Sequence, residues 1–159
     1  MPALLIDTNL LCLLVAGNVS SAAVTKHKRL AKYDLVDYTR VRALALRFGH
    51  LILCPHVLAE TSNISRLTAE PLRSLLGVAL LDIVDASTEM HVAAEVAALA
   101  PEYLRLGLTD AVLLELGETN RVLLSDDLDL CLAAEHRGYP VINYNYLRDG
   151  MTLEQIGAF

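Results

Sequence analysis

Short runs of consecutive apolar residues alternate along this chain with longer segments in which apolar residues recur at helical spacing. The runs are read as strands and cover residues 3–6, 51–54, 82–84, 121–124 and 141–142. Continuous apolar strands separated by helices are typical of a parallel sheet that is covered on both faces. The pattern therefore predicts an α/β fold around a central parallel sheet of about five strands.

Polar residues with capping side chains mark where the intervening helices begin. We expect a helix over 8–16 capped by Thr8 or Asn9, and Ser20 or Ser21 as the cap of the next. Further helices are predicted over 38–48, 56–67, 68–80, 87–100, 108–118, 128–136 and 152–159, with Thr68, Ser87 or Thr88, Thr109 or Asp110, and Thr152 at their starts. No repeat, low-complexity segment or linker interrupts the pattern, which predicts a single domain over residues 1–159.

Composition favours a cytoplasmic globular protein. Hydrophobic residues make up 54% of the 159 residues, yet no apolar stretch reaches the roughly 18 residues of a membrane span. The N-terminus has neither the basic region nor the cleavage site of a signal peptide. The cysteines, Cys12, Cys54 and Cys131, are odd in number and lie among aliphatic residues, so we expect buried free thiols.

The net charge of −6 argues against a protein that binds nucleic acid through its whole surface. The distribution of charge changes this picture, because a basic stretch lies within residues 26–47. It holds Lys26, Lys28, Arg29, Lys32, Arg40, Arg42 and Arg47. By itself this stretch is as well explained by a solvated helix face.

Acidic side chains from four distant segments are predicted to gather at one edge of the sheet. Asp7 follows the first strand directly, and Asp126 and Asp127 follow the fourth. Ligands of open α/β sheets bind outside the carboxyl ends of the strands, where these acids lie. Asp110 begins a helix whose preceding loop could reach the same edge, and Glu60 lies in the first turns of the helix after the second strand.

Carboxylates that gather in one place repel one another, so a bound cation is the usual reason for such a cluster. A donor set of oxygen atoms without Cys or His points to Mg²⁺ or Mn²⁺ rather than zinc. Each acid taken singly is also explained as a helix cap or a solvated helix start. The four together favour a shared site.

Four segments resemble the motifs of PIN-domain nucleases, the family that includes the toxins of VapC-type toxin–antitoxin pairs. They are "LLIDTNLL", "PHVLAETSN", "LGLTDAVLLELG" and "VLLSDDLDL", which occur in the family's order and span residues 4–130. The resemblance implies a three-layer α/β/α sandwich and a ribonuclease that uses Mg²⁺ or Mn²⁺. The segment between the first helix and the second strand is long, and at 159 residues the chain is longer than a minimal toxin of this type, which leaves open a PIN-domain ribonuclease of another kind.

The resemblance also implies the roles of individual residues. The four acids that would hold the metal and carry catalysis are Asp7, Glu60, Asp110 and Asp127. Asp126, beside Asp127, is the other candidate for the fourth position. The supporting positions correspond to Thr8, Asn9, Thr109 and Ser125, with Asp126 next to the site. The resulting hypothesis is that one or two metal ions activate water for in-line attack on an RNA phosphodiester.

The basic stretch would then hold the RNA backbone, with Lys28, Arg29, Arg40 and Arg42 as the expected contacts. Aliphatic residues that look exposed within 69–100 predict a covered surface, in a homodimer or against an antitoxin peptide. No membrane contact is expected.

Other classes with a strand-end aspartate fit less well. A haloacid-dehalogenase-type phosphatase needs a second aspartate where Asn9 stands, and a response-regulator receiver needs a strand-end lysine, whereas no lysine follows Lys32. A catalytically inactive PIN-like module that binds RNA or protein is the alternative from a different class.

Overall fold

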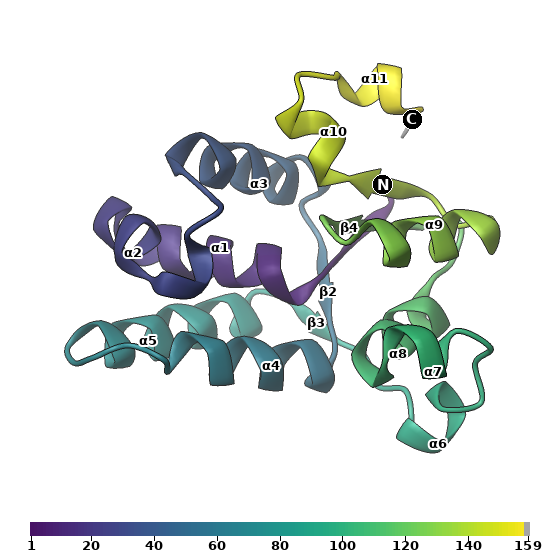
Figure 1. Cartoon of the computed structure of the whole chain (residues 1–159), viewed down its shortest axis with the longest axis horizontal. Coiled ribbons are helices and arrows are strands. Elements are labelled where there is room, and N and C mark those ends of the chain that lie inside the picture. The colour runs from purple at the N-terminus through teal and green to yellow at the C-terminus, as the bar shows by residue number, and fades with distance from the viewer. Residues whose placement is uncertain (158–159) are drawn as a thin grey trace.

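The computed structural model describes residues 1–157 and has an α/β fold built on one sheet of parallel strands (Figure 1). The sheet has the order β3-β2-β1-β4-β5 and consists of β1 (Ala3–Ile6), β2 (Leu51–Leu53), β3 (Thr88–Glu89), β4 (Arg121–Ser125) and β5 (Val141–Asn143). Helices flank the sheet, as in a three-layer α/β/α sandwich. The predicted fold class is confirmed.

Twelve helical segments connect the strands within residues 1–157. They are α1 (Thr8–Val19), α2 (Ser21–Lys26), the 3₁₀ helix η1 (Lys28–Leu30), α3 (Leu35–Phe48), α4 (Pro55–Ser65), α5 (Leu72–Asp85), α6 (Ala94–Ala97), α7 (Tyr103–Leu106), α8 (Leu108–Leu116), α9 (Leu128–His136), α10 (Tyr144–Arg148) and α11 (Leu153–Ile156). The predicted C-terminal helix over 152–159 ends at Ile156, and residues 158–159 lie outside the described part of the chain.

The third strand lies elsewhere than its sequence suggests. Residues 82–84 were predicted as a strand, but they belong to the last turn of α5. Ile83 is buried together with Leu76 and Ala79, which continues the helical spacing of that segment. The observed strand is Thr88–Glu89, two exposed residues at the edge of the sheet, where the sequence predicted a helix over 87–100.

Several helices begin at other capping residues than predicted, and two of these differences concern the predicted acids Asp7 and Asp110. The N-cap of α1 is Asp7 itself rather than Thr8 or Asn9, and that of α8 is Gly107 rather than Thr109 or Asp110. Asp110 therefore does not serve as a helix cap. Pro71, not Thr68, precedes α5, whereas Ser20 caps α2 and Thr152 caps α11 as expected.

Burial follows the pattern that the sequence predicted for a sheet covered on both faces. All four residues of β1 are buried, and so are seven consecutive residues of α1, from Leu10 to Ala16. The three cysteines are buried free thiols, as expected. Among residues 1–157, no helix combines the length and the apolar character that crossing a lipid bilayer requires.

Close packing of α1 against α3 depends on a glycine. A Cβ atom at Gly17 would lie 2.0 Å from Cδ2 of Tyr38, whose hydroxyl donates a hydrogen bond to Asn18 at 2.9 Å. Only a residue without a side chain fits at this approach. The contact fixes where α3 and the basic stretch lie relative to α1, the helix that Asp7 caps.

We predict that Gly17→Ala lowers the free energy of unfolding by about 1–3 kcal/mol, because Tyr38 must move away. The matched control is Gly77→Ala in the interior of α5, where an added Cβ meets nothing within 4 Å. This control raises the free energy of unfolding by about 0.5–1 kcal/mol, since alanine restricts the unfolded chain. Urea denaturation of the three proteins measures both effects, and equal shifts in the two variants would contradict the packing argument.

Candidate active site

Asp7 lies at the carboxyl end of the central strand, between β1 and α1, and its carboxylate is buried. One carboxylate oxygen accepts a hydrogen bond from the Thr8 backbone N–H at 2.6 Å, and the other accepts one from the Ser125 hydroxyl at 2.7 Å. Burial raises the pKa of Asp7 above its usual range, although both hydrogen bonds oppose that shift. The two hydrogen bonds thus hold the Asp7 side chain in a buried position where its negative charge is unfavourable.

Ser125 connects Asp7 to the loop after β4. Its hydroxyl donates to Asp7 and accepts a hydrogen bond from the backbone N–H of Asp127 at 3.0 Å. Asp127 then caps α9 by accepting the Leu130 N–H at 3.1 Å, while its side chain stays exposed. One hydroxyl therefore sets the relative position of two of the predicted acids.

Glu60 reaches the same region from α4. Its carboxylate accepts hydrogen bonds from the Thr8 hydroxyl at 3.0 Å and from the Thr109 hydroxyl at 2.5 Å. Thr8 belongs to α1 and Thr109 to α8, so the two threonines tie three helices together around one carboxylate. The structure thus brings the predicted supporting residues Thr8, Thr109 and Ser125 into contact with the predicted acids.

Asp110 is half-buried on the first turn of α8, and its carboxylate has no hydrogen-bond partner within residues 1–157. Burial raises its pKa to about 7, with further contributions from the negative charges of Asp7, Asp127 and Glu60. The charges of the other three predicted acids therefore all act on Asp110. A positive charge that enters the cluster would therefore stabilise the ionised form of this carboxyl group.

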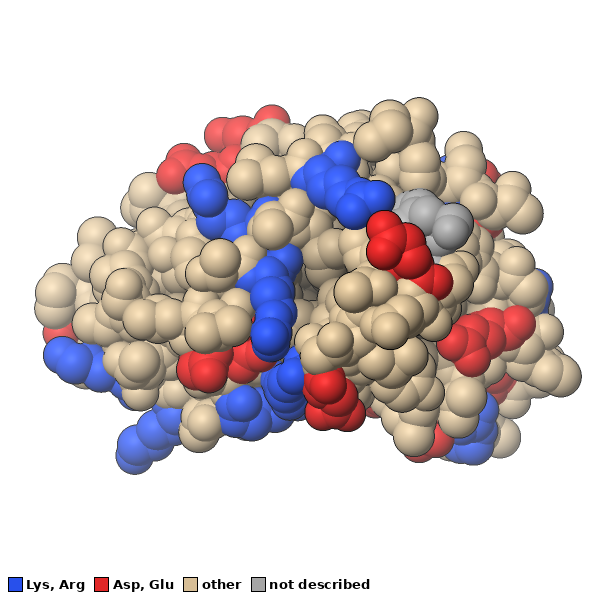
Figure 2. Space-filling view, turned by 90° about the horizontal axis from the view of Figure 1, so that it is seen from above, with Lys and Arg blue, Asp and Glu red and all other residues tan. Residues whose placement is uncertain are grey.

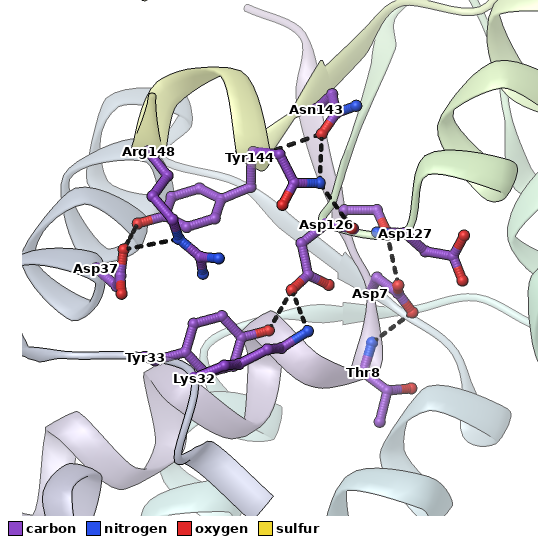
Figure 3. Close-up of polar contacts among 12 residues, drawn as sticks. Asp7, Thr8, Lys32, Tyr33, Asp37, Asp126, Asp127, Asn143, Tyr144 and Arg148 are labelled. Carbon is purple, nitrogen blue, oxygen red and sulfur yellow. Dashed lines mark hydrogen bonds and ion pairs between the residues drawn. The ribbon is translucent and has the colours of Figure 1, made fainter. Parts of the chain in front are cut away.

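Asp126, the alternative fourth acid, has a different environment from Asp127. Its carboxylate forms an ion pair with Lys32 at 2.7 Å and accepts a hydrogen bond from the Tyr33 hydroxyl at 2.5 Å (Figure 3). Although burial favours the neutral form, these contacts and a smaller contribution from Asn9 hold the pKa of Asp126 below its usual range. Asp126 already has a cation at its carboxylate, although its charge still helps to raise the pKa of Asp7, whereas the charge of Asp127 acts on both Asp7 and Asp110.

A second buried carboxylate, Asp37, lies beyond Tyr33. It accepts a hydrogen bond from the Tyr144 hydroxyl at 2.6 Å, and its Oδ1 atom lies 3.5 Å from Nε of Arg148. The Arg148 guanidinium lies over two rings, at 5.3 Å from the centre of Tyr33 and 5.4 Å from that of Tyr144. These contacts attach α10 to α3 beside the acid cluster.

The C-terminal helix α10 also holds the acidic loop directly. The Asn145 side-chain amide donates to the backbone carbonyl of Asp126 at 2.8 Å, and Asn143 caps the helix. Sequence reasoning did not select Lys32, Arg148 or Asn145 for the site. Lys32 was visible within the basic stretch. No local pattern indicates that Arg148 packs beside Tyr33 and Asp37, which lie more than a hundred positions earlier in the chain. Nor does any local pattern indicate that Asn145 binds Asp126, which lies 19 positions earlier.

The four predicted RNA contacts do not share one surface. Lys28 and Arg29 are exposed on η1, whereas Arg40 and Arg42 lie on α3. Residues two apart on a helix point in nearly opposite directions. Arg40 accordingly lines a cavity against α10 and α11, and Arg42 lines another against α5.

The chemistry of the acid cluster suits a hard divalent cation in part. The four predicted ligands are all carboxylates, three of which raise the pKa of the fourth, and oxygen donors of this kind are those that Mg²⁺ and Mn²⁺ prefer. In the conformations described for residues 1–157, however, no three His, Cys, Asp or Glu side chains converge on a point where they could hold a metal ion. Glu60 and Asp127 are exposed, so they are the ligands that would have to turn, and each would give up a hydrogen bond described above to do so.

Comparison with known proteins assigns no family. No protein-family model and no solved structure matches the chain. A stretch of 51 residues is 41% identical to part of thiamine-phosphate synthase from Corynebacterium efficiens, which is 32% of this chain and 24% of that enzyme. Since the chain spans about a quarter of the length of this relative, the match carries neither fold nor activity over to it.

The raised pKa of Asp110 predicts how stability depends on pH without added metal. The folded protein binds the Asp110 proton near pH 7, whereas the unfolded chain binds it near the usual value of 3.8. The folded state holds more protons between these values, so the free energy of unfolding falls as the pH rises from about 4 to about 7 and then levels off.

Asp110→Asn should flatten this decline and make the protein more stable than wild type at pH 8, because no charge is left to bury. Asp129→Asn, which alters an acid whose side chain is 72% exposed, is the control and should keep the wild-type slope. Thermal unfolding in EDTA between pH 4.5 and 8.5 measures the three slopes. If the stability of Asp110→Asn declined with pH as steeply as that of wild type, the ionisation of Asp110 would not be the cause of the decline.

Proposed function

We propose that the protein is a metal-dependent ribonuclease that hydrolyses RNA phosphodiester bonds at the cluster of Asp7, Glu60, Asp110 and Asp127. The observation that carries the proposal is the raised pKa of Asp110, which burial and the charges of the other three acids produce together. Such mutual repulsion is what a bound cation relieves. The resemblance of the surrounding segments to PIN-domain nucleases supports the same reading.

Each residue has a role that follows from its environment. Asp7, Glu60, Asp110 and Asp127 would hold Mg²⁺ or Mn²⁺, which would lower the pKa of water and neutralise phosphate charge. Ser125 fixes Asp7 relative to Asp127, and the two threonines aim Glu60. Because its pKa is about 7, Asp110 would be only partly ionised at neutral pH until a cation binds.

Asp126 is proposed to be a positioning residue and not a metal ligand. Lys32 and Tyr33 occupy its carboxylate, and Asn145 holds its backbone carbonyl. These three contacts fix the loop on which Asp127 sits.

The rival proposal is a PIN-like module that binds RNA or protein without catalysis. The absence of a ready-made metal cage within residues 1–157 favours it, whereas the presence of all four acids favours the nuclease. The homodimer, the antitoxin partner and the toxin role stay predictions. In their support, α5 exposes Leu75, Val78 and Leu81, which lie on one side of the helix.

The proposed activity predicts cleavage of a mixed pool of single-stranded RNA by purified protein with Mn²⁺, and its loss in EDTA. Asp7→Asn and Asp127→Asn should each lower the rate at least about a hundredfold, because each removes a charged ligand. Asp126→Asn is the matched comparison: it breaks the pair with Lys32, lowers the unfolding temperature and keeps metal-dependent cleavage with a smaller loss of rate than Asp127→Asn.

Three results would count against the proposal. Cleavage that persists in EDTA, or that Asp7→Asn leaves unchanged, would mean that another site or a contaminant is responsible. Equal losses in Asp126→Asn and Asp127→Asn would overturn the assignment of the fourth acid. If no RNA is cleaved and Mn²⁺ does not raise the unfolding temperature of the wild type, the binding module is the better reading.

A further inference from the structure

The sheet has two outer strands, β3 and β5, and they differ in exposure. All three residues of β5 are buried. In β3 both residues are exposed, and so is His91, two positions farther along the chain. An exposed strand edge presents backbone N–H and C=O groups that can pair with a strand of another molecule. We refer to residues 88–91 as the β3 edge.

The pairing of β3 with β2 shows which backbone groups face outward. The two strands form a parallel ladder, and the Met90 N–H donates to the Leu53 carbonyl at 2.8 Å. Backbone groups of successive residues point to opposite sides of a strand, so those of Thr88 and Met90 face β2. Those of Glu89 and His91 therefore face away from the sheet. Within residues 1–157, neither of these residues makes a backbone hydrogen bond.

The side chains of the β3 edge carry complementary groups. Glu89 and His91 share one face of the strand, as residues two apart in an extended chain do. Oε1 of Glu89 lies 3.3 Å from Nε2 of His91, and the two side chains are 40% and 71% exposed, respectively. Met90 between them is half-buried and belongs to the opposite face. An imidazole N–H donates to a carboxylate whether or not the ring is charged.

We propose that the β3 edge binds the β3 edge of a second copy of this chain, as an antiparallel pair around a twofold axis at Met90. Glu89 of each copy then lies opposite His91 of the other, and each of these pairs exchanges two backbone hydrogen bonds. Met90 meets its own counterpart on the other face of the sheet, where directly opposite side chains are close. The same residues thus serve on both sides of the contact, as a twofold interface requires.

Charge selects this register among those that the outward backbone groups allow. A slip of two residues in one direction places Glu89 opposite Glu89, and a slip in the other direction places His91 opposite His91. Like charges directly opposite each other on paired strands are destabilising, whereas opposite charges stabilise the pair. A different protein would need a strand with a matching pair of groups, whereas the β3 edge supplies both halves itself.

The charges on another face of the molecule do not single out a partner in this way. On the face seen from above, Lys and Arg side chains lie among Asp and Glu side chains, and neither sign covers the face alone (Figure 2). A surface of mixed sign steers a charged partner less than a surface of one sign does. The β3 edge instead combines directional backbone groups with one charge pair in fixed register.

The proposed dimer leaves the acid cluster of each copy complete. The strands of the sheet are parallel, and the twofold axis reverses their direction in the second copy. The two acid clusters, at the carboxyl ends of the strands, therefore lie at opposite ends of one continuous sheet. The inference goes beyond the proposed function and does not depend on it. An interface of so few residues gives a weak dimer that depends on concentration.

The test follows association of the whole chain by analytical ultracentrifugation over a series of protein concentrations. Glu89→Lys removes the carboxylate from both pairs, and His91→Glu sets two carboxylates against each other. Each variant should dimerise about tenfold more weakly than wild type, since the twofold axis doubles the effect of every substitution. The matched control, Glu135→Lys, makes the same change of charge at an exposed position of α9 and should associate like wild type.

A mixture of the Glu89→Lys and His91→Glu proteins should regain the association of wild type. In the mixed dimer, the introduced lysine lies opposite the introduced glutamate, and the original pair of Glu89 with His91 forms at the symmetry-related position. The contact between Glu89 and His91 within one chain stays broken in both variants. Only pairing between chains therefore explains a recovery.

Amide hydrogen exchange measured by NMR tests the strand pairing itself. The amides of Glu89 and His91 should become protected as the protein concentration rises, because they donate only across the interface. The Met90 amide already donates to Leu53 and should be protected at every concentration.

Several results would overturn the inference. Wild type that stays monomeric over the whole series would do so, and so would a mixture that shows no recovery. A dimer that persists in both variants, or that leaves the Glu89 and His91 amides unprotected, would place the contact elsewhere, such as on the exposed face of α5. Metal-dependent RNA cleavage should be equal in Glu89→Lys and wild type, so the presence or absence of cleavage bears on the proposed function alone.

Discussion

The hydrogen bond from the Ser125 hydroxyl to the Asp7 carboxylate, 2.7 Å long, joins the ends of β1 and β4, and the candidate site is assembled around it. Parallel pairing of these strands puts both residues at the same edge of the sheet. Because Ser125 also accepts the Asp127 N–H, the sheet sets the distance between two acids that are far apart in sequence. Glu60 and Asp110 then arrive on helices that pack against this edge.

The site is built so that its two sides differ in charge. On one side, Lys32 and Tyr33 neutralise Asp126, and Arg148 and Arg40 lie near the buried Asp37. On the other side, the charges of Asp7, Asp127 and Glu60 all act on Asp110, and none of these four carboxylates forms an ion pair with a cation from within residues 1–157. An acidic protein thus presents a basic approach to an acidic centre, which is the arrangement that a polyanionic substrate and a divalent ion need together.

Sequence predicts this fold where apolar runs are continuous and fails where they are not. The buried strand Ala3–Ile6 was evident, whereas Thr88–Glu89 is two exposed residues that only their neighbour β2 holds extended. The candidate acids could be proposed from the sequence because strand ends can be placed from the pattern. The proposed choice of Asp127 over Asp126 could not be made from adjacent identical residues, since it rests on the contacts of Asp126 with Lys32 and Tyr33, which form through tertiary packing.

The central claim is that the four carboxylates form one electrostatic unit that accepts a cation, and the carboxyl pKa of Asp110 reports on it most directly. We would follow the ¹³C resonance of that carboxyl group by NMR as a function of pH, with EDTA and with Mg²⁺. The account predicts titration near pH 7 in EDTA and a shift to well below that value with Mg²⁺. Titration near the usual value of 3.8 under both conditions would contradict it.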